Sequence, residues 1–328
     1  MVICLGIEST AHTFGVGIVD DKGNVLADAR DTLTTEKGGI IPAQAQKHHL
    51  ELKDKLLNKA MNDSKLTFDD IDFIAFSKSP GLAPCLRVGR DFAVELSEKY
   101  NKPLLGVNHI IGHLEEGKFF TEAKDPVFVF VSGANTQIIA HEAGKYRIFG
   151  ECLSIALGNV LDKFARELDL GFPGGPKIEQ LAKKGKYVEL PYTVKGMDVE
   201  FSGILTKCKQ LYQKGVLKED LCFSLQETLF SMLVEVTERA MAHCNKKEAL
   251  LIGGVAANKR LCEMLTIMCR ERGAKFFACP LKYAGDNGVQ IAIAGLKMFK
   301  VKQGLVESSE ADFDDSERVD SIETKWIN

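Results

Sequence analysis

The sequence predicts an α/β fold with two lobes, and a strand–turn–strand pattern that occurs twice is its main indication. Residues 2–8 form an apolar, strand-like run that ends in Glu8, and after a polar turn residues 14–19 alternate as a hairpin partner would. The same pattern returns over residues 127–140, where residues 132–136 form the turn. A chain of 328 residues is also long for one compact core. We therefore expect two lobes of related architecture.

Helical and strand patterns alternate after each hairpin. The expected elements are helices at 43–61, from Arg87 and at 223–243, and strands at 71–77 and 249–252. Apolar residues at positions 225, 229, 232, 233 and 236 follow the helical period, as in a half-buried helix. The segment 307–320 is acidic and poor in apolar residues, so we expect a loosely held surface segment, with Trp326 pinning its end.

The composition indicates a cytosolic protein. The sequence contains no apolar run of about 18 residues and no signal peptide, so we expect neither a membrane span nor secretion. Nine cysteines without a Cys-x-x-Cys pair are typical of reduced, mostly buried thiols. Because the net charge is −3, any RNA partner needs a local basic patch or a basic companion subunit.

His109 and His113 predict a metal site. On a helix, residues four apart lie on one face, so the two imidazoles can converge on one ion. Residue 110 is Ile where a zinc protease helix carries its catalytic Glu, which disfavours a protease. The turn at 285–288 presents Asp286, and a carboxylate is a natural companion to two His ligands. Two unrelated surface histidines and a plain β-turn are the alternatives.

Several loops have the composition of ligand-binding segments. Two strand–turn–strand units that offer N–H groups and hydroxyls across a cleft describe an actin-like or sugar-kinase-like nucleotide site. The turn at 253–258 places glycines between a strand and a helix, where a backbone can approach a ligand. Residues 171–179 hold two prolines and three glycines, which favours a shaped ligand-contacting loop.

Other polar residues have simpler interpretations. Asp162, with Lys163 and Arg166, is explained by a solvated helical face, and Ser202 by a helix N-cap. The lysines at 183, 184, 186, 207, 209 and 214 could contact a phosphate backbone, although exposed lysines are usually solubilising.

Taken together, these residues resemble the universal tRNA threonylcarbamoyladenosine family, in the form found as the catalytic subunit of the archaeal and eukaryotic KEOPS complex. The resemblance covers nearly the whole chain. Its nine ordered motifs are residues 6–13, 80–89, the His109/His113 pair, and residues 131–137, 159–166, 172–179, 201–206, 253–260 and 285–288.

The resemblance implies an actin-like (ASKHA) two-lobed fold of duplicated RNase H-like domains with a central cleft. We place the N-terminal lobe, with the His pair, at 1–124, and the C-terminal lobe, with the adenylate-binding loops, terminal helix and acidic tail, at 125–328. The implied reaction transfers the threonylcarbamoyl group of threonylcarbamoyl-adenylate to N6 of adenosine 37, in tRNAs that read codons beginning with A.

The resemblance also implies the site residues. His109, His113 and Asp286 would be catalytic and would hold one divalent metal ion, for which iron and zinc fit about equally. The donor, or an ATP- or AMP-type nucleotide in the same site, would be bound by Phe130, Val131, Ser132, Gly133, Ala134, Asp162, Gly175, Glu179 and Asn258. Relatives usually place a Tyr ligand where this chain has Phe130, so either water or substrate oxygen replaces that ligand or the strand register is shifted.

The implied partners are tRNA, a small atypical kinase, fused to the chain in some relatives, and a small dimerising subunit, without a membrane. Two other functions remain open. An actin- or sugar-kinase-like phosphotransferase or ATPase would use the same hairpins without the His pair. A nucleotide-binding scaffold would sense adenylates while partner subunits carry out the chemistry.

Overall fold

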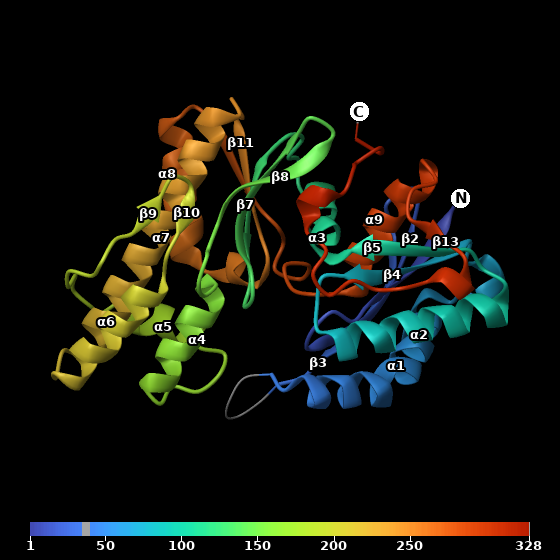
Figure 1. The fold of residues 1–328 in the computed structure, drawn as a ribbon, viewed down its shortest axis with the longest axis horizontal. Coiled ribbons are helices and arrows are strands. Elements are labelled where there is room, and N and C mark those ends of the chain that lie inside the picture. The colour runs from blue at the N-terminus through green and yellow to red at the C-terminus, as the bar shows by residue number, and fades with distance from the viewer. Residues whose placement is uncertain (35–39, 328) are drawn as a thin grey trace. The chain divides into compact units, whose positions relative to one another are not determined.

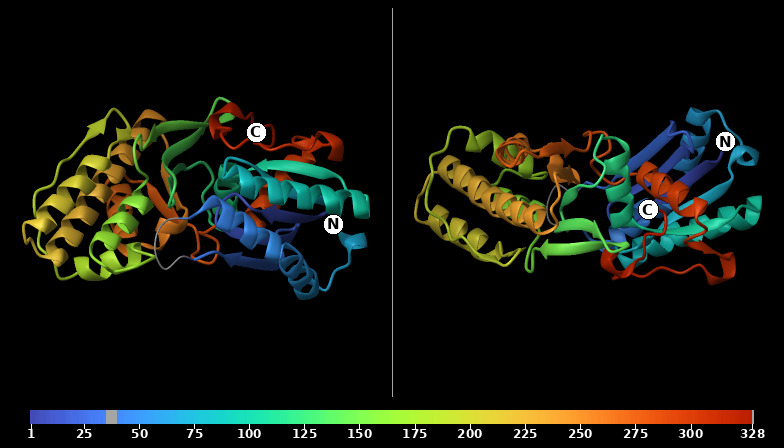
Figure 2. Two further views of the ribbon diagram at one scale, coloured as in Figure 1. Left: turned by 60° about the horizontal axis from the view of Figure 1, so that its bottom comes forward. Right: turned by 90° about the horizontal axis from the view of Figure 1, so that it is seen from above.

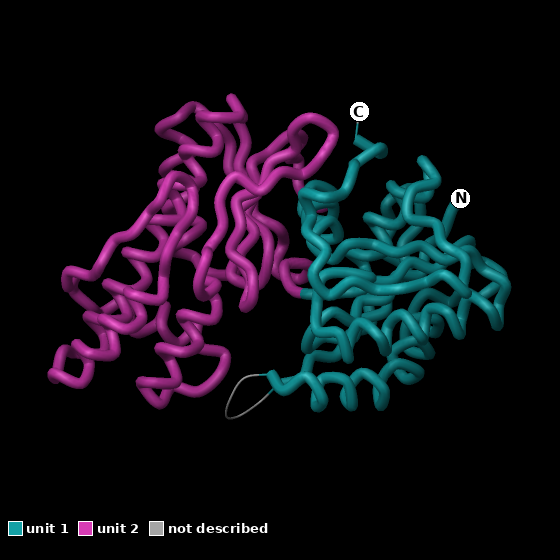
Figure 3. Tube along the Cα trace, in the orientation of Figure 1, with its two compact units in different colours: residues 1–119, 286–328 teal, residues 120–285 magenta. Residues whose placement is uncertain are grey.

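The computed structural model describes residues 1–34 and 40–327, and the chain forms two compact units (Figure 3). Unit 1 comprises Met1–Phe119 and Asp286–Asn328, and unit 2 comprises Phe120–Gly285. The first division lies close to the boundary expected at 124/125. Residues 286–328, however, were expected in the second lobe and pack with unit 1, because helix α9 (Gly288–Lys300) contacts strands β1 and β2 of that unit.

Unit 1 contains a six-stranded mixed sheet with the order β13-β5-β4-β1-β2-β3. Its strands are β1 (Ile3–Glu8), β2 (Thr13–Asp20), β3 (Val25–Thr32), β4 (Phe73–Ser79), β5 (Leu104–Asn108) and β13 (Leu305–Val306). Strands β1, β2 and β3 form an antiparallel meander, and β4 and β5 extend it in parallel from β1. The expected first hairpin is therefore present.

Helices cover both faces of this sheet. Helices α1 (Pro42–Ser64) and α2 (Ala83–Tyr100) pack on one face and on each other (Figure 1). Helix α9 packs on the other face beside α3 (His109–Phe119), the helix that carries the His pair. Helix α2 begins earlier than the expected Arg87, because Pro84 in its first turn suits a helix start.

Unit 2 repeats this topology in a five-stranded sheet with the order β12-β11-β6-β7-β8. The strands are β6 (Val127–Val131), β7 (Thr136–Glu142), β8 (Lys145–Glu151), β11 (Glu248–Ile252) and β12 (Lys275–Ala278). Again an antiparallel meander is followed by two parallel strands, here β11 and β12. The expected duplication of architecture is confirmed.

The long helix α7 (Lys218–His243) lies among further helices of unit 2, of which Figure 2 gives two more views. They are α4 (Leu157–Glu167), α5 (Gly175–Ala182), α6 (Ser202–Gln213) and α8 (Lys259–Glu271), with a small ribbon of β9 (Val194–Lys195) and β10 (Asp198–Val199). Their apolar faces and the sheet form one core that lies wholly within unit 2. Among the described residues, no helix is long and apolar enough to cross a membrane.

Three local expectations were wrong. Residues 171–179 are not one loop, because α5 begins at Gly175 with Pro176 in its first turn. Ser202 is the first residue of α6 and its hydroxyl bonds Glu200, so it does not cap the helix. The acidic segment is packed, not loose: Val319 is fully buried, and Glu317 accepts hydrogen bonds from Lys78 Nζ and Ser79 Oγ.

Candidate metal centre and nucleotide-binding loops

The His pair lies in the first turns of α3, directly after strand β5. Asn108 caps the helix, because its Oδ1 accepts hydrogen bonds from the N–H groups of Ile110 (3.0 Å) and Ile111 (3.3 Å). The cap starts the helix at His109 and brings His113 onto the same face. The two imidazole centroids lie 4.6 Å apart with the rings nearly perpendicular. The expected convergence of the two rings is present.

Asp286 completes a cluster of three ligand groups within unit 1. Its Oδ1 lies 3.2 Å from His113 Nε2 and 3.6 Å from His109 Nε2. One donor atom from each residue lies within 4.8 Å of the other two. Donors bonded at about 2.0–2.2 Å to a shared tetrahedral or octahedral ion are about 3–4 Å apart, so the three residues fit a divalent cation. The Asp286 side chain is only 16% exposed and does not point outward as expected for a plain turn.

Glu8 fixes the orientation of His109, and the sequence interpretation missed this role. Glu8 Oε2 lies 2.9 Å from His109 Nδ1, and Gln290 Nε2 and Thr10 Oγ1 lie 3.1 and 3.3 Å from the same atom. Nδ1 is therefore engaged on the inner side, and Nε2 is directed toward Asp286. A carboxylate that holds the second ring nitrogen typically orients a metal-bound imidazole. The available signal was an acidic residue at the end of an otherwise apolar strand.

Burial and neighbouring charges set the protonation of the three groups. Burial favours the neutral imidazole, but the Glu8 carboxylate outweighs it and raises the pKa of His109 to about 9. Burial lowers the pKa of His113. The carboxyl of Asp286 is also buried, yet the hydrogen bond from His113 and the charge on His109 hold its pKa below the ordinary value. The cluster therefore carries an anionic ligand and two imidazoles of unequal basicity.

A second group of expected residues lies at the strand ends of unit 2. In the turn after β6, the Ser132 N–H donates to the Asn135 carbonyl (2.9 Å), and Ser132 Oγ accepts from the Asn135 N–H (3.0 Å). A Cβ on Gly133 would meet no atom within 4 Å, so the turn is open on that side. Gly158 at the start of α4 packs closely under this turn, since a Cβ there would lie 2.5 Å from the Ser132 carbonyl oxygen.

The remaining expected nucleotide contacts form two small networks. Asp162 Oδ1 accepts a hydrogen bond from the Gly174 N–H (2.7 Å), and burial raises the pKa of the Asp162 carboxyl. Gly175 and Glu179 share one face of α5, and Glu179 Oε1 accepts from the Lys259 N–H (2.9 Å). These contacts hold α5 against α4 and the start of α8. Asp162 is thus not a merely solvated residue.

Asn258 joins the strand β11 to helix α8. A short 3₁₀ turn, Gly254–Ala257, follows the strand, and Asn258 caps α8 by accepting from the Leu261 N–H (3.1 Å). Its side-chain amide donates to Gln226 Oε1 (3.2 Å). The predicted sequence of strand, glycine turn and helix N-terminus is confirmed.

A model of the TsaD family, tRNA N6-adenosine threonylcarbamoyltransferase, matches residues 24–293. The chain belongs to this family. A family member from Thermococcus kodakarensis, named tRNA N6-adenosine threonylcarbamoyltransferase, is 54% identical over 99% of this chain and 100% of its own length. A probable bifunctional tRNA threonylcarbamoyladenosine biosynthesis protein from Methanobrevibacter smithii is 53% identical over the whole chain, which spans 61% of that relative.

Solved structures of low sequence identity confirm the actin-like fold. HypF from T. kodakarensis aligns with a TM-score of 0.62 at 15% identity, over 92% of this chain and 48% of HypF. Component A of the (R)-2-hydroxyglutaryl-CoA dehydratase from Acidaminococcus fermentans aligns with a TM-score of 0.57 at 14% identity, over 90% of this chain and 98% of that one. These similarities concern the fold alone.

Phe130, where we expect relatives of the family to have Tyr, lies in β6 opposite Gln137 and Ile252. Its ring is fully buried and offers no ligand atom. The phenyl side chain therefore packs in unit 2, and only the backbone at this position is suited to a polar ligand. The assignment of the nine nucleotide-contacting residues stays a prediction.

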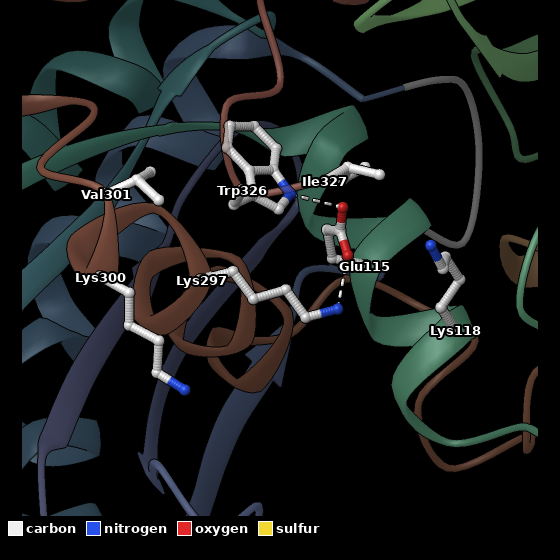
Figure 4. A pocket seen from close by; sticks show the side chains of 7 residues that line it. All are labelled: Glu115, Lys118, Lys297, Lys300, Val301, Trp326 and Ile327. Carbon is white, nitrogen blue, oxygen red and sulfur yellow. Dashed lines mark hydrogen bonds and ion pairs between the residues drawn. The ribbon is translucent and has the colours of Figure 1, made fainter.

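The end of the chain braces the His helix from its outer side (Figure 4). Glu115, two residues after His113, is almost fully buried and accepts hydrogen bonds from Trp326 Nε1 (2.8 Å) and Lys297 Nζ (2.5 Å). Because Lys297 belongs to α9, the carboxylate ties α3 to both α9 and the chain end. Trp326 thus pins this segment, as expected from the sequence.

Proposed function

We propose that the chain transfers the threonylcarbamoyl group of threonylcarbamoyl-adenylate to N6 of adenosine 37, in tRNAs that read codons beginning with A. Family membership over residues 24–293, together with the His109–His113–Asp286 cluster, supports this proposal. The names of the relatives give the transferase activity and the tRNA acceptor. The cluster disfavours a phosphotransferase, which needs no paired histidines.

The proposed transfer requires that the carbamoyl carbonyl be activated and that the AMP leaving group be oriented. The exocyclic amine of adenine is a weak nucleophile, and a divalent ion at the cluster would supply Lewis acidity toward the carbamoyl oxygen. The protein's part is to hold the ligands: Glu8 fixes the His109 ring, and Asn108 fixes the helix start. Two imidazoles and a carboxylate suit iron(II) and zinc, and we propose one such ion.

Unit 2 would bind the adenylate part of the donor. The open turn at Ser132–Asn135 and the glycine turn before α8 let phosphate or ribose oxygens approach the backbone closely. Asp162 and Glu179 are occupied by backbone N–H groups, so we assign them to shaping the binding loops and not to proton transfer. Such alignment of donor and leaving group contributes to rate by positioning.

We propose tRNA, a small atypical kinase and a small dimerising subunit as partners. The bifunctional relatives support a second activity that works with this one, since this chain spans only 61% of their length. All nine cysteines are free thiols, which supports a reducing compartment, and we propose the cytoplasm.

Single-turnover transfer of labelled threonine from threonylcarbamoyl-adenylate to unmodified tRNA tests the function, with the companion subunits present. The wild type is compared with His109→Ala, with metal-stripped protein, and with His243→Ala, an exposed histidine of unit 2, as the matched control. We expect label on adenosine 37 with the wild type and the control, and at least about a hundredfold loss for the other two, since a lost metal ligand removes the Lewis acid.

Metal content per chain, measured by elemental analysis, is the second readout. We expect about one ion in the wild type and the control and much less in His109→Ala. An assembled wild type that transfers nothing contradicts the function. Transfer that ignores both His109 and metal preserves the function but contradicts the metal's role.

A further inference from the structure

A basic pocket lies between helices α4 and α6 in unit 2. It has a volume of about 490 Å³ and is lined by Lys163, Arg166, Glu167 and Lys209. The first three residues occupy positions i, i+3 and i+4 of α4 and therefore share one face. Lys209 reaches the pocket from α6, which packs beside α4 (Figure 1). Three cationic side chains from two helices thus surround one hollow.

Two of these cations lie outside the ion pairs of the described part of the chain. Lys209 pairs with Glu167 at 2.9 Å, which neutralises both. The side chains of Lys163 and Arg166 are exposed and form no hydrogen bond or ion pair with a described residue, and Arg166 interacts electrostatically with the nearby Asp162 carboxylate. The four side chains that line the pocket therefore carry a formal net charge of +2.

The surrounding sequence is also basic. Residues 157–214 contain ten Lys and Arg against seven Asp and Glu, whereas the whole chain has a net charge of −3. A polyanion would therefore find a locally favourable surface on an otherwise acidic protein.

Helix α4 links this pocket to the proposed adenylate loops. Its first turn packs under the Ser132 turn through Gly158, and Asp162 bonds the loop before α5. Lys163 and Arg166 follow Asp162 within about one helical turn, or 5.4 Å of helix length. A phosphate held in the pocket would lie close to the place where the donor's adenylate is expected.

We propose that this pocket binds the phosphodiester backbone of the substrate tRNA next to its target adenosine. The inference rests on the proposed function and names the docking surface for the acceptor. Arg166 offers a planar fork that matches two phosphate oxygens, and Lys163 offers a compact charge beside it. Phosphate contacts of this kind position the RNA without reading its sequence. The pocket would thus present the adenosine, while other contacts select the tRNA.

Binding of fluorescein-labelled unmodified tRNA to the full chain, followed by anisotropy from 0.05 to 0.3 M KCl, tests the proposal. The variant Lys163→Gln/Arg166→Gln should bind about tenfold more weakly at 0.1 M salt, and its salt slope should fall by about 2, because each lost phosphate contact removes about 0.9. The control Lys247→Gln/Lys275→Gln changes two exposed cations that form no ion pair with any residue the structure describes, at the end of β11 and β12 remote from Gly253. It should bind as the wild type does.

The variant Glu167→Gln should change the affinity for tRNA in the opposite direction. It removes the carboxylate that neutralises Lys209, so tRNA should bind severalfold more tightly. A loss of folding would weaken binding in both variants, so opposite changes identify an electrostatic surface. Equal binding by the wild type and Lys163→Gln/Arg166→Gln, or no binding of tRNA by the wild-type chain at low salt, overturns the proposal.

Two further measurements distinguish a wrong docking surface from a wrong proposed function. ATP binding by calorimetry should be the same in the wild type and Lys163→Gln/Arg166→Gln; a selective loss of ATP affinity would mean that the pocket serves the nucleotide phosphates and would overturn the tRNA assignment. If the assembled wild type binds tRNA but transfers no threonylcarbamoyl group, the proposed function fails while the surface stands. If the wild type transfers the threonylcarbamoyl group and Lys163→Gln/Arg166→Gln binds tRNA as tightly as the wild type, the proposed docking surface is wrong and the proposed function is retained.

Discussion

His49 in helix α1 illustrates how a buried titratable side chain affects stability without any part in the metal cluster. Its imidazole is fully buried against Phe14, with ring centroids 5.4 Å apart. Burial, and then the neighbouring His48, lowers the pKa of His49 to about 4; His12 faces it as well. The folded chain therefore keeps His49 neutral at pH values where the unfolded chain protonates it.

The stability of unit 1 should fall as pH falls from about 6.5 to 4, because in this range the unfolded state binds the proton and the folded state does not. For His49 alone, the loss between pH 7 and 5 is about 2 kcal/mol. Urea unfolding at both pH values measures it, with His49→Leu as comparison. The Leu variant should lose about 2 kcal/mol less than the wild type over this interval. An identical pH dependence would contradict the assignment.

At the same scale, the sequence predicted that the candidate ligands His109, His113 and Asp286 converge, but it did not predict the residues that hold them in place. The convergence of His109 and His113 could be predicted because the two residues are four apart on one helix. Glu8 and Gln290 lie 101 and 181 residues from His109, so a local sequence pattern cannot predict their side-chain contacts with its ring. The residues alone suggested Asp286 as a companion of the two His side chains but left a plain β-turn open, and the family resemblance then favoured Asp286 as the third candidate ligand.

Among the elements, α9 is placed by glycines that allow its N-terminus to touch the β1–β2 hairpin. A Cβ on Gly17 would lie 2.3 Å from the Val289 N atom, and a Cβ on Gly288 would lie 2.2 Å from the Gly17 N atom. Both neighbours are backbone atoms that cannot move aside as a flexible side chain can. The close approach fixes the start of α9 and therefore Asp286, two residues earlier.

Gly17→Ala should destabilise unit 1 by about 1–3 kcal/mol through overpacking and should lower the metal content by displacing Asp286. Urea unfolding and elemental analysis measure the two effects. Gly203→Ala in α6 is the matched control, because its Cβ would meet nothing within 4 Å and Ala is about 1 kcal/mol better than Gly in a helix. Normal metal content in Gly17→Ala would show that this contact does not set Asp286.

The two hairpins were predictable as elements because alternating apolar residues and polar turns are local signals. The packing of the C-terminal segment could not be predicted. It depends on single long-range contacts such as that of Glu317 with Ser79, whereas the acidic composition of the segment indicates an unpacked surface segment. The start of α5 was missed for a different reason: glycines and prolines indicated a loop, although Pro176 is suited to a first helical turn.

For the whole molecule, the two units differ in how the chain builds them. Unit 2 is one continuous segment with its own apolar core, whereas unit 1 needs two segments that are far apart in the sequence. One face of the sheet of unit 1 is covered mainly by α9, with α3 beside it, and is largely bare until α9 is in place.

A fragment of residues 120–285 should therefore fold alone, and a fragment of residues 1–119 should not, because its sheet would expose an apolar face. Circular dichroism during heating should show a cooperative transition for the first fragment and none for the second. A cooperative transition of the 1–119 fragment would contradict this division of the fold.

The discontinuity of unit 1 has a consequence for biosynthesis. A ribosome that has made Phe119 must add all of unit 2 before Asp286 and α9 emerge, which takes roughly 10 to 30 seconds at about 5–20 residues per second. During this interval the nascent chain presents His109 and His113 without their carboxylate companion and without the helix that covers them. The second unit, although it starts later in the sequence, is synthesised in full before the first unit, and the three candidate metal ligands are together only after Asp286 has been added.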